Sequence, residues 1–198
     1  MKTLYKALMA SAAVLAISTA SAKAADPFAG LYIGAHAGYN LSNIDLSVAS
    51  LSWNTSGTAI GIHGGYGWRV SNMLYAGIEA DWSILNSSGD TLGITAAFDW
   101  SASLRGRIGI PIGNAMPYLT AGVAWTRGGM DAGFVSGAKT EKGFVYGGGV
   151  DFAITNNWIA RAEYLRVDYG NVGGIPIPGV NFEADSHTVR GAISYKFN

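Results

Sequence analysis

The sequence has 198 residues, of which 49% are hydrophobic and only 13% are charged, and its 13 basic and 13 acidic side chains balance. A chain of this length fits one domain, and its charge lacks the basic footprint of a nucleic-acid-binding protein. The chain contains no cysteine, which excludes a disulfide framework and a thiolate metal site. Beyond the N-terminal apolar run, no segment offers the roughly 18 consecutive apolar residues of a transmembrane helix.

The first 24 residues have the pattern of a secretory signal peptide. Lys2 and Lys6 precede an apolar stretch over residues 7–17, and the segment 22–24 fits the small-x-small cleavage rule, so we expect cleavage after Ala24. The apolar stretch is shorter than the roughly 20 residues that a membrane-spanning helix needs. We therefore expect an exported chain with a single folded domain, residues 25–198.

Apolar and polar residues alternate in eight segments of this domain. A period of two is typical of a β-strand whose two faces meet different surroundings. The final segment places Ile193, Tyr195 and Phe197 on one face, as in a strand that closes a transmembrane barrel. The expected strands are 31–40, 59–70, 74–85, 96–110, 116–127, 143–155, 158–169 and 186–198.

The connections between these strands alternate in length. Short connections, 71–73, 111–115 and 156–157, follow the second, fourth and sixth strands. Longer connections follow the other strands: 41–58, 86–95, 128–142 and 170–185. Short periplasmic turns and longer extracellular loops produce this rhythm. We expect an all-β fold, an eight-stranded antiparallel up-and-down transmembrane β-barrel with both termini in the periplasm.

The polar face of the expected strands carries acids, bases and many glycines. In a soluble barrel the apolar face would point inwards, whereas in a membrane barrel it faces lipid and the charges fill the interior. Glycine weakens a strand on a solvent face, but inside a narrow barrel it leaves room for large charged side chains. Aromatic residues near both ends of the apolar face match two interfacial girdles. The pattern therefore favours the membrane barrel.

An ion-pair network is expected inside the barrel. Eight strands leave an interior just wide enough for side chains, and a buried charge requires a partner. Glu79 and Asp81 should reach the same depth as Arg105 and Arg107 of the next strand, so the interior should be plugged and not an open channel. The expected members are Glu79, Asp81, Asp99, Arg105, Arg107, Asp151, Arg161, Glu163 and Arg190.

Four segments carry a resemblance to a known family. Residues 75–81, 103–109, 157–164 and 195–197 are similar to the small outer-membrane barrels of alphaproteobacteria, the porin-like surface antigens, which are more distantly related to the barrel of outer-membrane protein A. The resemblance implies an outer-membrane protein that contacts lipopolysaccharide and serves envelope integrity and surface recognition. It also implies that Ile193, Tyr195 and Phe197 form the signal for the barrel-assembly machinery, although Asn198 follows the usual terminal aromatic.

An outer-membrane enzyme, such as a lipid A deacylase or a protease, is one alternative. Such an enzyme needs a nucleophile with a base within hydrogen-bond reach. His36 and His63 point inwards among glycines and are expected to be structural. The acid, hydroxyl and imidazole groups around His187 are contiguous in sequence, which does not orient a catalytic triad. We expect no enzymatic activity, no cofactor and no metal.

Two further alternatives are a narrow porin for small solutes and a haemin-binding surface protein. Haem iron would use His187 and Tyr169 near the loop end, and a porin would be revealed by its conductance. At the loop rim, Arg127 and Arg166 either snorkel or pair with lipopolysaccharide phosphates. The expected partners are lipopolysaccharide and outer-membrane lipid, the barrel-assembly machinery, and an extracellular ligand at the loops.

Overall fold

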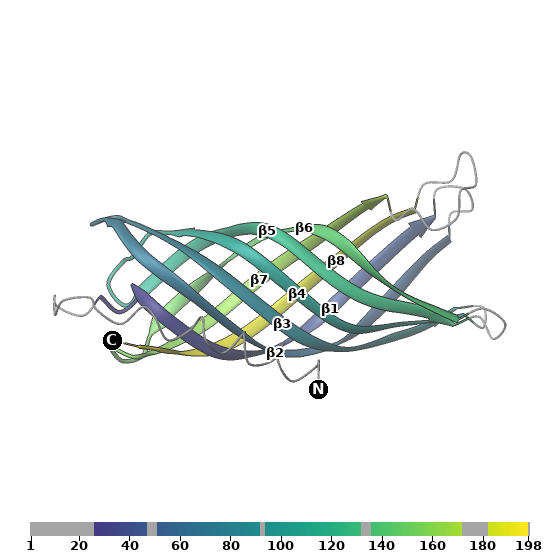
Figure 1. Ribbon diagram of the computed structural model, residues 1–198, viewed down its shortest axis with the longest axis horizontal. Helices are drawn as coiled ribbons and strands as arrows, with labels where there is room; N and C mark the ends of the chain where they lie inside the picture. Colours follow the sequence, from purple (N-terminus) through teal and green to yellow (C-terminus); the bar gives the residue numbers. More distant parts are fainter. Residues whose placement is uncertain (1–25, 47–50, 92–93, 132–135, 172–181, 198) are drawn as a thin grey trace, which may run out of the picture.

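The computed structural model describes residues 26–46, 51–91, 94–131, 136–171 and 182–197. The expected signal peptide, residues 1–24, lies outside the described residues. The part of the chain that is described forms eight strands (Figure 1): β1 Gly30–Leu46, β2 Leu51–Ser71, β3 Leu74–Thr91, β4 Ile94–Gly109, β5 Ala115–Asp131, β6 Ser136–Ala153, β7 Trp158–Asn171 and β8 Phe182–Lys196.

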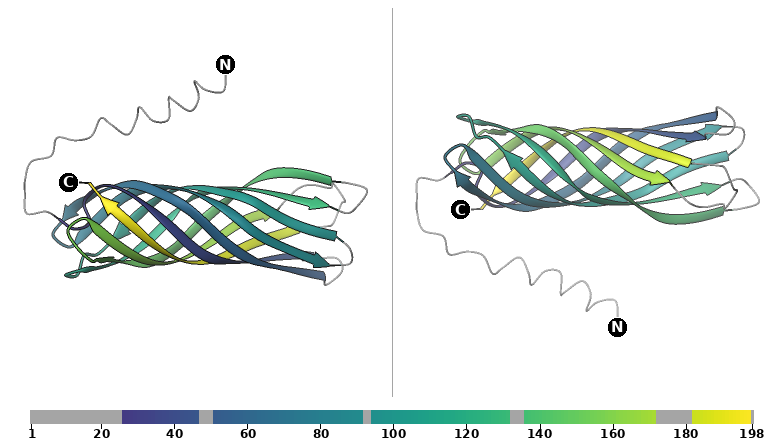
Figure 2. Two further views of the ribbon diagram at one scale, coloured as in Figure 1. Left: turned by 90° about the horizontal axis from the view of Figure 1, so that it is seen from below. Right: turned by 90° about the horizontal axis from the view of Figure 1, so that it is seen from above.

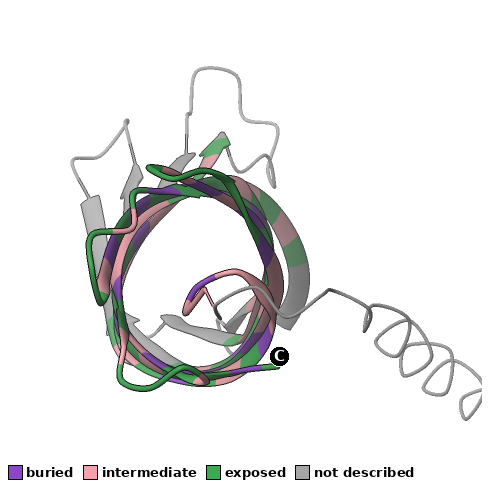
Figure 3. Cartoon of the chain, turned by 90° about the vertical axis from the view of Figure 1, so that its left-hand side faces the viewer, coloured by how far each residue is buried: buried purple, intermediate pink, exposed green. Residues whose placement is uncertain are grey.

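The strands form a closed antiparallel barrel. Each strand pairs with its neighbours in sequence, and β1 also pairs with β8. The strands are tilted and wind around the long axis (Figure 2), and a view along that axis shows a closed ring (Figure 3). Closure leaves no free sheet edge to pair with another chain. The fold class expected from the alternating sequence is therefore confirmed.

Within the described residues, no helix is long and apolar enough to cross a membrane.

The two faces of the wall have the polarity that the sequence predicted. On the outer face, the exposed fractions of Ile60, Leu119 and Val189 are 64%, 68% and 62%. On the inner face, Glu79 and Arg105 are each 1% exposed. This arrangement is the reverse of a water-soluble domain, and it suits a wall that faces hydrocarbon while polar groups fill the lumen.

The strands continue well into the segments that the sequence assigned to loops, which corrects the expected loop lengths. The β2 strand has 21 residues and β7 has 14, whereas a membrane crossing needs about 9–11. The pairing of β1 with β2 extends to Leu46 and Leu51, and that of β3 with β4 to Thr91 and Ile94. Alternation located the central part of each strand and did not reveal these extensions.

Glycine on the inner face makes room for the side chains that fill the lumen. A Cβ atom on Gly67 would lie 1.9 Å from the hydroxyl oxygen of Tyr75, and one on Gly65 would lie 2.5 Å from that of Tyr32. A Cβ atom on Gly61 would meet the ring of His36 at 2.7 Å. Such approaches are far shorter than packed atoms tolerate, so these positions must lack a side chain.

Candidate functional site

The centre of the lumen holds a layer of carboxylate and guanidinium groups, here called the ionic layer. It is built from five strands, because inward positions on neighbouring strands reach the same depth. Within the described residues, its four acids face its four arginines, which makes the layer neutral overall. Its members are Glu79 and Asp81 on β3, Arg105 and Arg107 on β4, Asp151 on β6, Arg161 and Glu163 on β7, and Arg190 on β8.

Glu79 is the hub of this layer. Its Oε1 accepts a hydrogen bond from Nη2 of Arg105 at 2.5 Å. Its Oε2 accepts from Nη1 of Arg161 at 2.6 Å, from the hydroxyl of Tyr32 at 2.7 Å and from Nη1 of Arg107 at 3.3 Å. The Glu79 side chain has no exposed surface. Three cations and a phenol thus offset the cost of burying one carboxylate.

Asp151 holds the turn side of the layer. Its Oδ1 accepts from Nε of Arg161 at 2.7 Å, and its Oδ2 accepts from Nη2 of Arg107 at 2.8 Å. The guanidinium carbon of Arg107 lies 3.9 Å from the ring centroid of Tyr118, within the range of a cation–π contact. Arg107 is therefore held by aromatic packing as well as by charge.

Glu163 and Asp81 hold the loop side of the layer. Glu163 accepts from Nε of Arg190 at 2.6 Å and from Nη1 of Arg105 at 3.0 Å. Asp81 accepts from Nη1 of Arg190 and from the hydroxyl of Ser103. Arg190 therefore bridges an acid of β7 and an acid of β3 across the lumen.

Asp99 does not belong to the ionic layer, and this corrects the expectation from sequence. Its side chain is 59% exposed, and its nearest described ion-pair partner is Nε of Arg127 at 3.8 Å. The pairing of β4 with β5 shifts register between Phe98 and Trp100. Asp99 has no partner in this pairing, so it is the extra residue of a β-bulge, where the alternation of faces breaks. Simple alternation therefore placed Asp99 on the wrong side of the wall.

Two phenols complete the layer, and sequence reasoning missed both. The hydroxyl of Tyr32 contacts Glu79, and that of Tyr118 donates to Glu163 at 2.7 Å. Both tyrosines are at most 4% exposed. The sequence did contain a signal for both tyrosines. Each lies next to an outward apolar residue and therefore on the inward face of its strand, where an aromatic residue is unusual.

His36 and His63 extend the ionic layer towards β1 and β2. Their Nδ1 atoms lie 3.4 Å apart, and their Nε2 atoms lie 2.8 Å from Ser83 Oγ and 2.7 Å from Ser194 Oγ respectively. Arg190 Nη1 is 3.3 Å from His36 Nε2. A guanidinium only donates, so His36 accepts at Nε2 and carries its proton on Nδ1, directed at His63. These contacts give both imidazoles a structural role.

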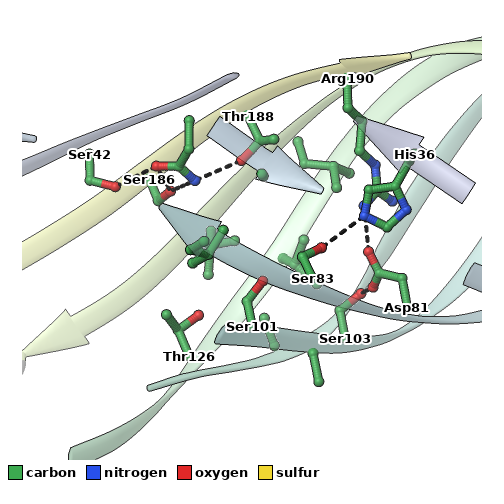
Figure 4. Close-up of a pocket in the computed structure, with 18 of the residues that line it drawn as sticks. His36, Ser42, Asp81, Ser83, Ser101, Ser103, Thr126, Ser186, Thr188 and Arg190 are labelled. Atoms are coloured by element: carbon green, nitrogen blue, oxygen red, sulfur yellow. Dashed lines mark hydrogen bonds and ion pairs between the residues drawn. The ribbon is translucent and has the colours of Figure 1, made fainter. Parts of the chain in front are cut away.

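A cavity of about 50 Å³ lies on the loop side of the ionic layer. Figure 4 shows His36, Asp81 and Arg190 at one end of it and Ser42, Ser186 and Thr188 at the other. This volume suits a few water molecules at about 10–15 Å³ each and is too small for haem. Across the ranges that the structure describes, no group of three or more metal-ligating side chains is arranged to hold a metal ion.

The structure does not bring the two haem candidates together. The His187 ring contacts the hydroxyl of Tyr164 at 2.6 Å through Nδ1 and Asp185 at 2.8 Å through Nε2, and Tyr164 is 45% exposed on the outer face. Tyr169 lines the cavity inside the barrel, where its hydroxyl contacts Thr126 at 2.7 Å. The two residues lie on opposite sides of the wall and cannot share one iron.

Arg127 and Arg166 lie on the outer side towards the loop end, and each has an acid beside it. Arg127 faces Asp99, as described above, and Nη2 of Arg166 lies 3.3 Å from Oδ2 of Asp185. The two arginine side chains are 49% and 42% exposed. Exposed pairs of this kind are weak, so both guanidinium groups stay available to a stronger anion.

The three residues of the expected assembly signal lie on the outer face at the turn end. Ile193, Tyr195 and Phe197 are 48%, 37% and 46% exposed. The rings of Tyr195 and Phe197 meet edge to face at 5.3 Å, and Trp158 meets Tyr195 in the same way at 5.2 Å. The three rings thus form an aromatic cluster on the outer face at the turn end, the kind of position that interfacial aromatic residues occupy in membrane proteins.

Comparisons with known proteins agree on this architecture. A family profile described as "Outer membrane protein beta-barrel domain" matches residues 10–197. The 25 kDa outer-membrane immunogenic protein of Brucella abortus is 30% identical over the full length of both chains. The 22 kDa outer membrane protein of Rhizobium leguminosarum is 31% identical, over 76% of this chain and 68% of that protein.

Among solved structures, the chain is similar to Neisserial surface protein A, with a TM-score of 0.56 and 20% identity over 85% of this chain and 98% of that one. It is also similar to the attachment invasion locus protein of Yersinia pestis, with a TM-score of 0.52 and 14% identity over 85% and 99% of the two chains. At these identities the likeness establishes the shared barrel fold.

Proposed function

The chain belongs to the outer membrane protein β-barrel family, and from this premise we propose that it is a sealed, non-enzymatic barrel that supports the outer envelope and presents its loop end as a contact surface. Its location is the outer membrane, as in its relatives. The observation that carries the proposal is the ionic layer, in which acids and arginines of strands that are not neighbours contact one another across the lumen.

The ionic layer is the proposed plug of the lumen. A permeating ion would have to separate buried pairs such as Arg161 with Glu79, and breaking one such pair costs about 3–5 kcal/mol. A heat-modifiable gel shift on the outer-membrane fraction identifies folded barrel, and single-channel recording on the same preparation tests the plug. We expect no conductance steps. Regular steps would contradict a sealed barrel and favour the alternative of a narrow porin.

Arg127 and Arg166 are the proposed contacts with lipopolysaccharide. Both guanidinium groups are about half exposed at the loop end, and the planar fork of arginine matches phosphate oxygens. Asp99 and Asp185 would balance their charge while no lipid is bound.

Binding of purified lipopolysaccharide to the folded barrel tests this contact. The double variant Arg127→Ala, Arg166→Ala should bind about ten-fold more weakly, since losing charge-assisted hydrogen bonds costs about 1.5–3 kcal/mol. Arg69→Ala, which removes a cation at the turn end, is the matched control and should bind like the wild type. Equal binding by the wild type, the double variant and Arg69→Ala would end the proposal.

The same preparation tests the absence of enzymatic activity. Mass spectra of the recovered lipopolysaccharide should show intact acyl chains, and a missing chain would contradict a non-enzymatic barrel.

Export and assembly are proposed to follow the signals read from the sequence. Mass spectrometry of the mature protein should place its first residue directly after Ala24. Phe197→Ala should slow folding by the barrel-assembly machinery, whereas Val189→Ala, on the outer face of the same strand but nearer the loop end, should not. The extracellular ligand is proposed to contact the loop segments between the strands.

A further inference from the structure

Residues 26–29, which precede β1, turn into the barrel. Phe28 lies before the first strand, yet its exposed fraction is 1%. It packs with Tyr75, Met116 and Ile159, all inward-facing, and Ala153 packs against this cluster. Because segments outside the strands usually run over the protein surface, a fully buried aromatic here indicates a specific seat.

The position of this seat follows from the strand register. Tyr75 lies four residues nearer the turn end of β3 than Glu79, and Ile159 lies two residues nearer the turn end of β7 than Arg161. Phe28 therefore sits directly on the turn side of the ionic layer. Along the barrel axis, the lumen contains an apolar layer at its turn end and the ionic layer at its centre. The cavity lies beyond the ionic layer, towards the loop end.

Asp26 fastens the segment at three points. Its Oδ1 accepts hydrogen bonds from the backbone N–H of Phe28 at 3.0 Å and of Ala29 at 3.4 Å. Its Oδ2 pairs with Arg69 at the end of β2. Its backbone oxygen accepts from Nζ of Lys196 on β8 at 2.9 Å. The segment is thereby bound to two strands and to itself.

Gly30 allows the chain to leave the segment and enter β1. Its φ angle is +123°, a conformation that side-chain-bearing residues rarely adopt. The chain can therefore reverse direction sharply between the lumen and the wall. The same turn brings Phe28 under the ionic layer while β1 pairs with β2 and β8 from its first residues.

We propose that residues 26–29 form an N-terminal plug that seals the periplasmic mouth of the barrel independently of the ionic layer. The barrel then has two seals in series. When the plug leaves, the seat formed by Tyr75, Met116 and Ile159 opens to the periplasm, while the ionic layer still blocks the lumen. This proposal goes beyond the sealed barrel proposed above, because it assigns the turn-end seal to residues 26–29, outside the strands.

A single-cysteine experiment tests the plug. The natural chain contains no cysteine, so Met116→Cys puts one reporter thiol in the seat, and Met73→Cys puts one on a turn residue that is 74% exposed. A membrane-impermeant maleimide should label folded Met73→Cys quickly and folded Met116→Cys slowly. Adding Phe28→Ala should raise the labelling rate of Met116→Cys at least about ten-fold, since burial limits access through local opening.

Three variants make the test specific. Phe28→Leu keeps an apolar side chain in the seat and should preserve most of the protection. Ile112→Ala, at an exposed turn position of the same end, should leave the rate unchanged. Arg69→Ala releases the fastening and keeps Phe28, and it should give an intermediate rate even if Phe28→Ala does not fold. The heat-modifiable gel shift selects the folded protein in each case.

Two results would overturn the plug. Met116→Cys could label as fast as Met73→Cys in the folded protein with Phe28 intact, or the Phe28 and Arg69 variants could leave its protection unchanged. Conductance separates the two seals: Phe28→Ala alone should remain closed, and an open channel in that variant would disprove two independent seals. Conductance of the unmodified protein would instead refute the sealed barrel and leave the labelling result standing.

Discussion

Nη1 of Arg161 on β7 lies 2.6 Å from Oε2 of Glu79 on β3, although the two strands are on opposite sides of the closed sheet. This contact crosses the lumen and connects parts of the wall that share no backbone pairing. The same carboxylate also contacts Arg105 and Arg107. Since Tyr32 of β1 contacts it as well, Glu79 couples four strands, and the stability of the barrel should depend strongly on it.

Replacement of Glu79 by Ala should lower the free energy of unfolding by about 3–5 kcal/mol, because it leaves buried guanidinium groups without their carboxylate. The unfolding midpoint of the folded band in detergent is the measurement. Asp99→Ala is the matched control, since it removes an exposed partner of Arg127 and should cost about 0–1 kcal/mol. An unchanged midpoint for Glu79→Ala would show that the ionic layer does not stabilise the barrel.

Gly122, which faces the lumen, should tolerate no side chain, whereas Gly106 on the outer face should tolerate one. A Cβ atom on Gly122 would lie 2.1 Å from the backbone oxygen of Leu104, whereas one on Gly106 would have its nearest neighbour at 3.9 Å. Gly122→Ala should therefore destabilise the barrel by about 1–3 kcal/mol through overpacking, and Gly106→Ala should have little effect. The same midpoint assay distinguishes them, and similar midpoints would contradict the prediction.

The fastening of the N-terminal plug should weaken in acid. Burial raises the pKa of Asp26, but the hydrogen bond and charge of Arg69 and the N–H groups of Phe28 and Ala29 lower it, so the net pKa lies below its ordinary 3.8. The ionised carboxylate thus stabilises the folded state at pH values above the unfolded pKa, and this contribution disappears as the pH falls through the folded pKa.

The comparison of wild type with Asp26→Asn isolates this contribution. The difference between their unfolding midpoints should be constant above about pH 5 and should vanish below the lowered pKa. A difference that stays the same into strong acid would mean that the charge of Asp26 does not hold the plug.

Haemin should show no binding that depends on His187. Both nitrogens of that ring are occupied by Tyr164 and Asp185, and Tyr169 faces the cavity on the other side of the wall. Titration of the folded barrel with haemin should give the same Soret spectrum for the wild type and for His187→Ala. A Soret shift lost in the variant would revive the haemin-binding alternative.

Sequence reasoning predicted the strands and their faces better than their lengths. Outward residues such as Ile60 and Leu119 follow from alternation because each strand crosses one hydrocarbon layer with one face in lipid. The pairing of β1 with β2 continues to Leu46 and Leu51, past the ranges that alternation delimited. Asp99 was misplaced for a related reason, since a local register shift resets the parity and leaves no trace in composition.

The plug was absent from the sequence prediction because the residues that bury Phe28 are all distant from it in the chain. Phe28 is a single aromatic in a short segment before the first strand, and nothing in its neighbours indicates burial. Its seat combines residues of β3, β5 and β7, which meet only after the barrel has closed. The tyrosines of the ionic layer differ from Phe28, because the alternation of their strands already predicts that they face inwards. Only their hydrogen-bond partners could not be predicted.

The sequence by itself determined that this chain forms an eight-stranded barrel, that its apolar face looks outwards and that acids and bases share the interior. These properties follow from a two-residue period, which is local. The tertiary structure decided which acid meets which base, that Asp99 lies outside and that Phe28 closes the turn end. Such pairings depend on the tilt and register of the closed sheet, and closure brings together side chains that are far apart in the chain.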